Sequence, residues 1–422
     1  MQQFTSTTNG IHIRGLTTSQ FKTSQCQIQF VSPLSNKSAP RRALLAYLLK
    51  AVSQDFPTRK QMNHHLESLY ASHLRVGVKK VGNAHVITFY LSVINHDFTL
   101  EKEDLLEALF KVLSGSLYSP LFDPSIFNEE RQALIDYMNE VASDPLKYAL
   151  LETYNTMYDG DPYHTRSLGT IADLEAVTLE DIHASYQSLI EEDTIYVEYV
   201  GNRDEETVTN LVSHYLKPNT VKKAHSFISP SDFSNIQPID KRLYKPIKQT
   251  KLVTSYRVPV TYDHDDYYTL VVLNALLGGG SDSLLFHEVR NNAGLCYFIG
   301  SSYDQFKGSV IIYTGIEKSN EEAVLPLIND VIDSIKSTTY QTDHLTIAKK
   351  AIITSLISSL DSSYSLLNHL AKGLYFNKPF DPDHAIEAVK RVTQDDIARC
   401  AKQLILNVTV IVEGGNDENN NL

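Results

Sequence analysis

The chain has 422 residues, of which 42% are hydrophobic and 21% are charged, and its formal net charge is -12. This length exceeds that of one typical domain, so two or more domains are expected in a folded globular protein. The acidic balance argues against a nucleic-acid partner, because no basic stripe is available to replace phosphate counterions.

The N-terminal residues have neither a basic segment nor an apolar one, so we do not expect a signal peptide in MQQFTSTTNGIHIRG. No apolar run approaches the ~20 residues that span a bilayer, so we expect no membrane partner. The cysteines Cys26, Cys296 and Cys400 are far apart, which argues against a disulfide framework or a cysteine zinc site. We therefore expect a soluble cytoplasmic protein.

In chain order, the first half shows five segments with clear patterns. A strand alternates apolar and polar residues, a short apolar helix follows, and a β-rich run precedes a long helix. Another helix then opens at a threonine N-cap followed by acids and leads into a strand. The segments are 27–34, 41–50, 85–94, 131–144 and 177–202.

The second half repeats these segments in the same order, at 252–260, 267–279, 309–316, 349–361 and 392–416. A unit of about two hundred residues thus occurs twice, which is far longer than a solenoid repeat. We predict an α+β fold of two homologous domains, each a mostly antiparallel sheet with helices packed on one face. The predicted domains are 1–216 and 251–422, and the proline-rich, polar residues 217–250 are predicted to form a linker.

Four histidines were considered as metal ligands: His64, His65, His73 and His85. Adjacent side chains on a helix diverge by about 100°, so His64 and His65 cannot face one metal. Neither H-E-x-x-H nor H-x-x-E-H occurs anywhere in the chain. We interpret these histidines as solvent-exposed or structural.

The glycine run 278–280 follows a predicted helix and has no Lys-Ser/Thr pair after it, so it does not predict a phosphate loop. No G-x-S-x-G elbow is present to indicate a serine hydrolase.

A second candidate site flanks the turn between a helix that ends near Arg290 and a strand that begins near Leu295. Arg290 and Tyr297 could project from this turn into the same space. A guanidinium beside a phenol is a good clamp for a peptide carbonyl or a developing oxyanion. The alternative is an ordinary surface arginine and a cross-strand tyrosine, and spacing alone favours that alternative.

Several stretches of the chain resemble the insulinase/pitrilysin family of inverted-motif zinc peptidases, in the branch of the mitochondrial processing peptidase and its bacterial relatives. These stretches are LGGGSDSLLFHEVRNNAGLCYFIGSSYDQFKGSVIIY, FNEERQALIDYMNEVASDP, HTRSLGT and VTLEDIHASY. The resemblance extends in order over nearly the whole chain. It implies two homologous α+β domains that close like a clamshell around an extended peptide. It also implies that Arg290 and Tyr297 hold the substrate near the metal.

The departure from the family lies in the first half. The family carries H-x-x-E-H on the helix after its first strand, and this position falls on Ala43-Leu44-Leu45-Ala46-Tyr47. The resemblance thus places the first ligand at Ala43, the general base at Ala46 and the second ligand at Tyr47. The third ligand, a glutamate in the family, falls near Tyr137, with Asp136 beside it.

Zinc catalysis needs about three protein ligands and an activated water. Alanine has no ligand atom, and a tyrosine with an unperturbed pKa near 10 is a poor ligand at neutral pH. We therefore expect no metal, no cofactor and no catalytic residue in this chain.

The favoured hypothesis is a catalytically inactive peptidase homologue that forms a mixed dimer with an active paralogue. The paralogue would supply zinc, and this chain would supply Arg290 and Tyr297 to bind the peptide substrate. A second hypothesis is a stand-alone peptide-binding or scaffold protein, as a homodimer. A third is an active zinc peptidase with displaced ligands.

Overall fold

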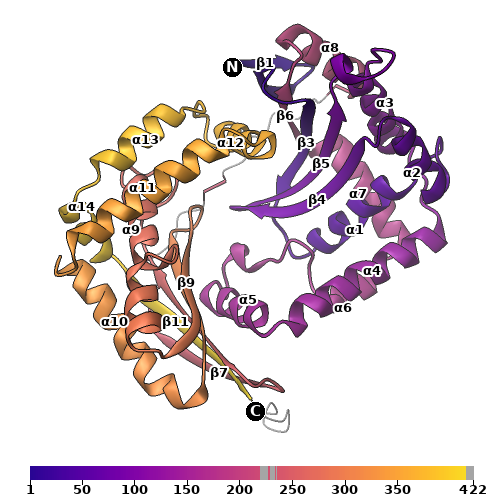
Figure 1. Ribbon diagram of the computed structural model, residues 1–422. Coiled ribbons are helices and arrows are strands. Elements are labelled where there is room, and N and C mark those ends of the chain that lie inside the picture. Colours follow the sequence, from indigo (N-terminus) through magenta and orange to yellow (C-terminus); the bar gives the residue numbers. More distant parts are fainter. Residues whose placement is uncertain (219–226, 229–232, 234, 415–422) are drawn as a thin grey trace. The chain divides into compact units, whose positions relative to one another are not determined.

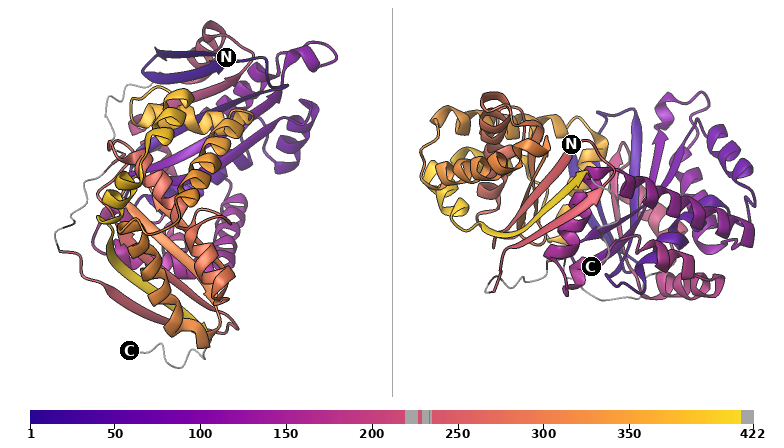
Figure 2. Two further views of the ribbon diagram at one scale, coloured as in Figure 1. Left: turned by 60° about the vertical axis from the view of Figure 1, so that its left-hand side comes forward. Right: turned by 90° about the horizontal axis from the view of Figure 1, so that it is seen from below.

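A computed structural model describes residues 1–218, 227–228, 233 and 235–414 (Figures 1 and 2). Residues 219–226, 229–232 and 234 of the predicted linker and the last eight residues of the chain therefore lie outside the described residues. The contacts divide the chain into two compact units. Unit 1 comprises 1–138, 165–227 and 359–380, and unit 2 comprises 139–164, 228–358 and the residues from 381 onwards.

Unit 1 contains a six-stranded sheet in the order β1-β2-β6-β3-β5-β4. All neighbouring strands are antiparallel except the parallel pair β2–β6. On β3, Cys26, Ile28 and Phe30 point to the hydrophobic core and are fully buried. The strands are β1 (Gln2–Thr8), β2 (Ile11–Thr17), β3 (Thr23–Pro33), β4 (His73–Val81), β5 (Ala84–Ile94) and β6 (Thr194–Gly201).

Helices α1, α3, α7 and α8 pack against the strands of this sheet and bury its apolar core (Figure 1). Helix α7 begins at Thr178, whose side chain accepts a hydrogen bond from the Asp181 amide in a capping box. The helices of the first repeat in unit 1 are α1 (Ala39–Ala51), α2 (Arg59–Ser68), η1 (His96–Phe98), α3 (Leu105–Tyr118), α4 (Pro124–Ser143), α6 (Ile171–Ala176), α7 (Leu179–Glu192) and α8 (Glu205–Tyr215).

Unit 2 contains a five-stranded sheet in the order β7-β11-β8-β10-β9, antiparallel except for β7–β11. The strands are β7 (Ile239–Lys245), β8 (Thr250–Arg257), β9 (Cys296–Asp304), β10 (Ser309–Ile316) and β11 (Ile405–Gly414). The helices that follow β8 are α9 (Tyr267–Gly278), η3 (Phe286–Asn292), η4 (Lys318–Asn320), α10 (Glu321–Lys336), α11 (Thr342–Ser359), α13 (Pro382–Arg391) and α14 (Gln394–Ala401).

The second face of each sheet is covered by a helix from the other repeat. Helix α5 (Pro145–Met157), followed by η2 (Pro162–His164), packs on β8, β10 and β11 of unit 2. Helix α12 (Ser363–Tyr375) packs on β2, β3 and β6 of unit 1. The compact units therefore differ from the sequence halves 1–216 and 251–422, because each half contributes one helix to the other unit.

The predicted α+β fold class is confirmed by two sheets that each carry helices. One local assignment needs correction: Ile239–Lys245, placed in the linker, forms β7. The strand has no clear alternation of apolar and polar residues in its sequence, because it is rich in basic residues. These residues are accommodated by ion pairs, Lys241 with Glu152 and Arg242 with Glu321. Cys26, Cys296 and Cys400 are free thiols, as expected. In the described part of the chain, no helix is both long and apolar enough to span a bilayer.

A buried ion pair fixes α1 to the sheet of unit 1. The Arg42 guanidinium donates to both carboxylate oxygens of Asp193, at 2.9 and 2.6 Å. Asp193 is the residue that joins α7 to β6. The Nε atom of Arg42 donates to Nδ1 of His85 at 3.1 Å, and His85 Nε2 donates to the Ser167 carbonyl at 2.9 Å. Burial and the Arg42 charge lower the pKa of His85 to about 3, so this imidazole is neutral. It is a structural histidine, as interpreted from the sequence.

A polar cluster lies on the opposite face of the same sheet, which we term the α12 face and define by Gln27, Gln29 and Glu198. Glu198 is fully buried, accepts a hydrogen bond from Gln29 Nε2 at 2.8 Å, and lies cross-strand from Gln27 and Arg14. Tyr375 of α12 donates a hydrogen bond to Gln29 Oε1. Burial raises the pKa of Glu198 to about 7, against the opposing effects of Gln29 and the Lys79 charge.

We predict that Arg42→Met lowers the free energy of unfolding by about 3–5 kcal/mol, because it leaves the Asp193 carboxylate buried without its cation. Arg42→Met with Asp193→Leu should lose less than the single variant, since neither charge then remains. Urea denaturation followed by circular dichroism measures both. Arg41→Met is the matched control: Arg41 pairs with Asp181 at the surface, so its loss should cost at most about 1 kcal/mol. Equal decreases in the free energy of unfolding of the Arg41 and Arg42 variants would contradict a stabilising role specific to the buried Arg42–Asp193 ion pair.

We also predict a pH-dependent effect of Glu198→Gln. The pKa of Glu198 is higher in the folded protein than in the unfolded chain, so wild-type stability falls as the pH rises toward 7. Glutamine does not ionise, so the stability of the variant does not fall over this pH range. At about pH 8 the variant should therefore be more stable than wild type by on the order of 1–3 kcal/mol. The advantage should shrink at about pH 5. The same change at exposed Glu191 is the control, and an identical pH response of both variants would refute the prediction.

Candidate functional site

The position of the absent metal motif lies in the middle of α1. Ala43 and Ala46 are both 0% exposed, and α1 packs there against α7 and β4. The small side chains thus lie inside the core of unit 1 and offer no ligand atom or base.

The structure brings two of the predicted ligand positions close together. Burial raises the pKa of Tyr47, and the nearby Tyr137 and Glu130 of α4 raise it further. Tyr137 itself is 54% exposed. Both hydroxyls therefore belong to one small cluster, in which a protonated phenol can donate a hydrogen bond.

Glu130 was not identified from the sequence, although it lies two helical turns before Tyr137 and so on the same face of α4. Burial raises the pKa of Glu130, against the charges of Arg59 and Lys50. Arg59 on α2 donates to Glu130 at 2.9 Å and forms an ion pair with Glu129 at 3.0 Å. The spacing of seven between Glu130 and Tyr137 was the available signal.

The residues of this cluster do not fit a catalytic zinc site. Alanine cannot bind metal, and the raised pKa of Tyr47 makes its phenolate form still less accessible at neutral pH. Glu130 is engaged by Arg59, and Asp136 accepts a hydrogen bond from Gln132 at 2.8 Å. Among the described residues, no group of three or more His, Cys, Asp and Glu side chains is arranged to hold a metal ion. We derive no reaction step through a metal in this chain.

The other histidines considered lie elsewhere. His64 and His65 are on α2, where the His65 ring stacks on Phe56 with centroids 4.6 Å apart. His73 is exposed at the start of β4.

Arg290 lies on η3, a π-helix that leads directly into β9. The tight connection is held by bonds from the Ala293 amide to the Glu288 carbonyl and from the Leu295 amide to the Val289 carbonyl. Gly294 has φ +66, a left-handed conformation that suits glycine. Arg290 is exposed, with Cζ 4.7 Å from the Phe286 ring centroid. Single π-helical turns are frequent at functional sites.

Tyr297 lies near the start of β9 and is 54% exposed. Its hydroxyl donates to Glu317 Oε1 at 2.7 Å, and this bond to a carboxylate raises the pKa of Tyr297. Arg290 lies within electrostatic range of Cys296, the residue before Tyr297. The structure thus places Arg290 beside the start of β9, without a hydrogen bond between Arg290 and Tyr297 in the described part of the chain.

Tyr297 lines a cavity of about 450 Å³ at the end of β10. Glu317 and Lys318 follow β10 directly, and Lys248 and Gln249 precede β8. Sequence reasoning missed these residues because they are far apart in the chain and meet only through strand pairing. The lining residues are Lys248, Gln249, Tyr297, Ile316, Glu317, Lys318 and Ser319.

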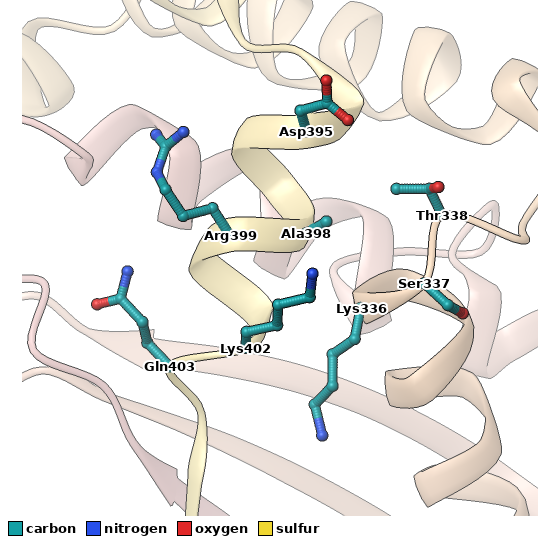
Figure 3. A pocket seen from close by; sticks show the side chains of 8 residues that line it. All are labelled: Lys336, Ser337, Thr338, Asp395, Ala398, Arg399, Lys402 and Gln403. Carbon is teal, nitrogen blue, oxygen red and sulfur yellow. The ribbon is translucent and has the colours of Figure 1, made fainter.

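A second cavity of about 470 Å³ lies between the ends of α10 and α14 and contains none of the predicted site residues (Figure 3). Lys336 pairs with Asp333 at 3.0 Å, and Arg399 pairs with Asp266 and Asp396, each at 2.9 Å. Cations near helix C-termini also complement the helix dipoles. Lys336 and Arg399 therefore have a structural explanation.

Comparison with known proteins agrees with this arrangement. The family described as "Peptidase M16 inactive domain" matches residues 176–352. The protein named "Probable inactive metalloprotease YmfF" from Bacillus subtilis is 27% identical over 403 residues, which cover 94% of each chain. YmxG of the same organism, named an uncharacterized zinc protease, is 23% identical over 300 residues, covering 69% of this chain and 71% of YmxG.

The fold is shared with solved structures. A conserved protein from Enterococcus faecalis superposes with a TM-score of 0.90 at 24% identity, covering 98% of this chain and 99% of that one. A peptidase M16 inactive domain from Pseudomonas fluorescens gives a TM-score of 0.82 at 17% identity, covering 99% and 98%. The chain is therefore similar to the M16 peptidases, the insulinase/pitrilysin family, and to a probable inactive metalloprotease among them, and it lacks the H-x-x-E-H motif.

Proposed function

We propose that this chain is the substrate-binding subunit of a mixed complex, in which a paralogous M16 peptidase supplies the zinc and the catalytic base. One contrast carries the proposal. On the α1 face that would hold a metal, Ala43 and Ala46 are fully buried and have no ligand atom, and Tyr47 stands at the second ligand position, whereas Arg290 and Tyr297 are exposed. A cytoplasmic location, as expected from the sequence, is part of the same proposal.

Arg290 and Tyr297 have the chemistry that the role requires. The exposed guanidinium can donate to a peptide carbonyl or to a developing oxyanion. The Tyr297 hydroxyl donates its only proton to Glu317 and is oriented by it, so toward a peptide it presents its acceptor lone pairs to a backbone N–H. Both groups act on a peptide that the partner's zinc cleaves, so neither is catalytic by itself.

Peptide binding would use strand addition at a sheet edge. The order of the strands leaves β4 at one edge of unit 1 and β9 at one edge of unit 2. An extended peptide that pairs with such an edge gains main-chain hydrogen bonds. Tyr297 lies on β9 itself and would contact a peptide added there.

A stand-alone peptide-binding or scaffold protein is the second candidate, because the same exposed edges would serve it as a monomer or homodimer. An active zinc peptidase that uses displaced ligands is the third, with Glu130, which lies in electrostatic range of Tyr47, and Asp136, beside Tyr137 in the sequence, as its candidate carboxylates. Reconstitution separates the first two: peptidase activity that appears only when the chain is mixed with an intact-motif paralogue supports the mixed complex. Binding without any such gain supports the stand-alone role.

We predict that Arg290→Ala lowers kcat/KM of the reconstituted complex by about 10²-fold, comparable to the loss of one oxyanion donor. Complex assembly, followed by size-exclusion chromatography, should not change. Arg391→Ala removes another exposed arginine of unit 2, from α13, and should leave kcat/KM unaltered. An Arg290→Ala complex with full activity would remove the proposed role of this residue.

We further predict that the isolated chain, dialysed against zinc, retains less than about one-tenth of an equivalent, because about three ligands are needed for a stable site. Inductively coupled plasma mass spectrometry measures the metal, and a fluorogenic peptide assay with and without chelator measures activity. Stoichiometric zinc together with chelator-sensitive cleavage would establish the displaced-ligand peptidase instead.

A further inference from the structure

The edge strand β4 differs in charge from the other sheet edges. Its sequence, HLRVGVKKV, carries Arg75, Lys79 and Lys80 and no acid, in a chain whose net charge is -12. Strand β1 has no charged residue, and β9 has only Asp304. The cations of β7 have partners, since Lys241, Arg242 and Lys245 bind Glu152, Glu321 and the Ala142 carbonyl.

Strand pairing puts two of the β4 cations on the α12 face. Arg75 lies cross-strand from Tyr90, Gly77 from Thr88 and Lys79 from Val86. Leu74, by contrast, is buried in the hydrophobic core on the other face. Because strand residues alternate, Arg75, Gly77 and Lys79 share the face that carries Gln27 and Gln29.

Neither cation is neutralised within the described residues. Arg75 is exposed and forms no ion pair there. No carboxylate lies within ion-pair distance of Lys79 in the same part of the chain, although its Nζ lies 5.9 Å from the Tyr375 ring centroid. Burial lowers the pKa of Lys79, and the Glu198 charge opposes this effect. Further along the same face, Arg14 and Lys372 add positive charge against the single buried acid, Glu198.

Gly77 lies between the two cations on β4 and lets the Tyr90 ring of the neighbouring strand lie close to its backbone. A Cβ atom at this position would lie only 3.3 Å from Tyr90 Cε2, so the Tyr90 ring covers Gly77. Glycine in the interior of a strand often marks a place where another backbone approaches closely. A bulky side chain of an added strand, placed opposite Gly77, could lie against Tyr90 as a cross-strand aromatic pair.

The spacing defines what the added strand must carry. Residues four apart on a strand are separated by about 13 Å and point to the same face, so Arg75 and Lys79 match two side chains four apart in an added strand. The residue between these two would lie opposite Gly77. An acid, then an aromatic or other bulky residue, then an acid at alternate positions fits all three.

Edge lysines also occur as protection against aggregation, and this is the simplest other explanation of the charge. Protection requires only charge at the edge, however. It does not require an interior glycine beside a tyrosine ring, or cations without a carboxylate partner, among the described residues, on the polar face of the sheet.

Resting on the proposed peptide-binding function, we propose that β4 accepts an extended acidic segment, with carboxylates opposite Arg75 and Lys79 and a bulky side chain over Gly77. The proposal names a substrate class for this edge: acidic, extended stretches of polypeptide.

The test is fluorescence anisotropy with the full-length chain and three labelled peptides that differ only in two positions. The parent is Thr-Glu-Val-Phe-Val-Glu-Thr, and the others carry Gln or Lys at both Glu positions. The parent should bind about tenfold tighter than the Gln peptide, and the Lys peptide should bind most weakly. The preference should shrink from about 50 mM to about 300 mM salt, because partly exposed charges are screened.

Arg75→Glu should lower the affinity for the parent and raise that for the Lys peptide. Lys111→Glu makes the same change at an exposed position on α3 and should preserve the wild-type order. Equal affinities for all three peptides, or an unchanged order in Arg75→Glu, would overturn the acidic preference and leave peptide binding standing. Failure of every peptide to bind would instead contradict the proposed function itself.

Discussion

The ion pair between Arg42 and Asp193 determines where α1 can lie. Both side chains are almost fully buried, so each charge needs polar partners: Arg42 and Asp193 bind each other, and Arg42 also donates to His85 and to the Phe30 carbonyl. Arg42 immediately precedes Ala43, so the same bond that holds the helix also fixes the position of the absent metal motif. The helix is therefore structurally required whether or not it carries ligands, and this explains how alanines can stand there in an intact fold.

Much of this fold was predictable from local patterns. Alternating strands, apolar helices and the capping boxes at Thr178 and Thr393 depend on residues close in sequence, and all of them are present in the structure. The exchange of α5 and α12 between the units was not predictable, because their apolar residues match any buried surface and nothing local specifies which sheet they cover. The strand at 239–245 was also missed, since its basic residues find carboxylates on distant elements.

The candidate site also combines features that local sequence predicts with features that depend on contacts between distant segments. The spacing of Ala43, Ala46 and Tyr47 predicted that they lie on one helix face. The family resemblance identified that face as the position of the absent metal motif. The role of Glu130 depended on the packing of α4 near α1, and that of Glu317 on the pairing of β10 with β9. Sequence reasoning therefore located residues that are close together in the sequence or match the family motif, and missed Glu130 and Glu317, whose contacts form where distant segments pack together.

The two units use different chemistry for the same packing problem. Beneath α5, the sheet of unit 2 presents apolar side chains such as Val253, Val410 and Val412. Beneath α12, the corresponding face of unit 1 presents Gln29 and a buried Glu198, and burying a carboxylate costs free energy. Unit 2 shows that this architecture can cover the second face of a sheet with hydrophobic residues, so the topology does not require the polar face. The polar face therefore needs an explanation other than stability, and the proposed peptide recognition by unit 1 would provide one that does not depend on a metal.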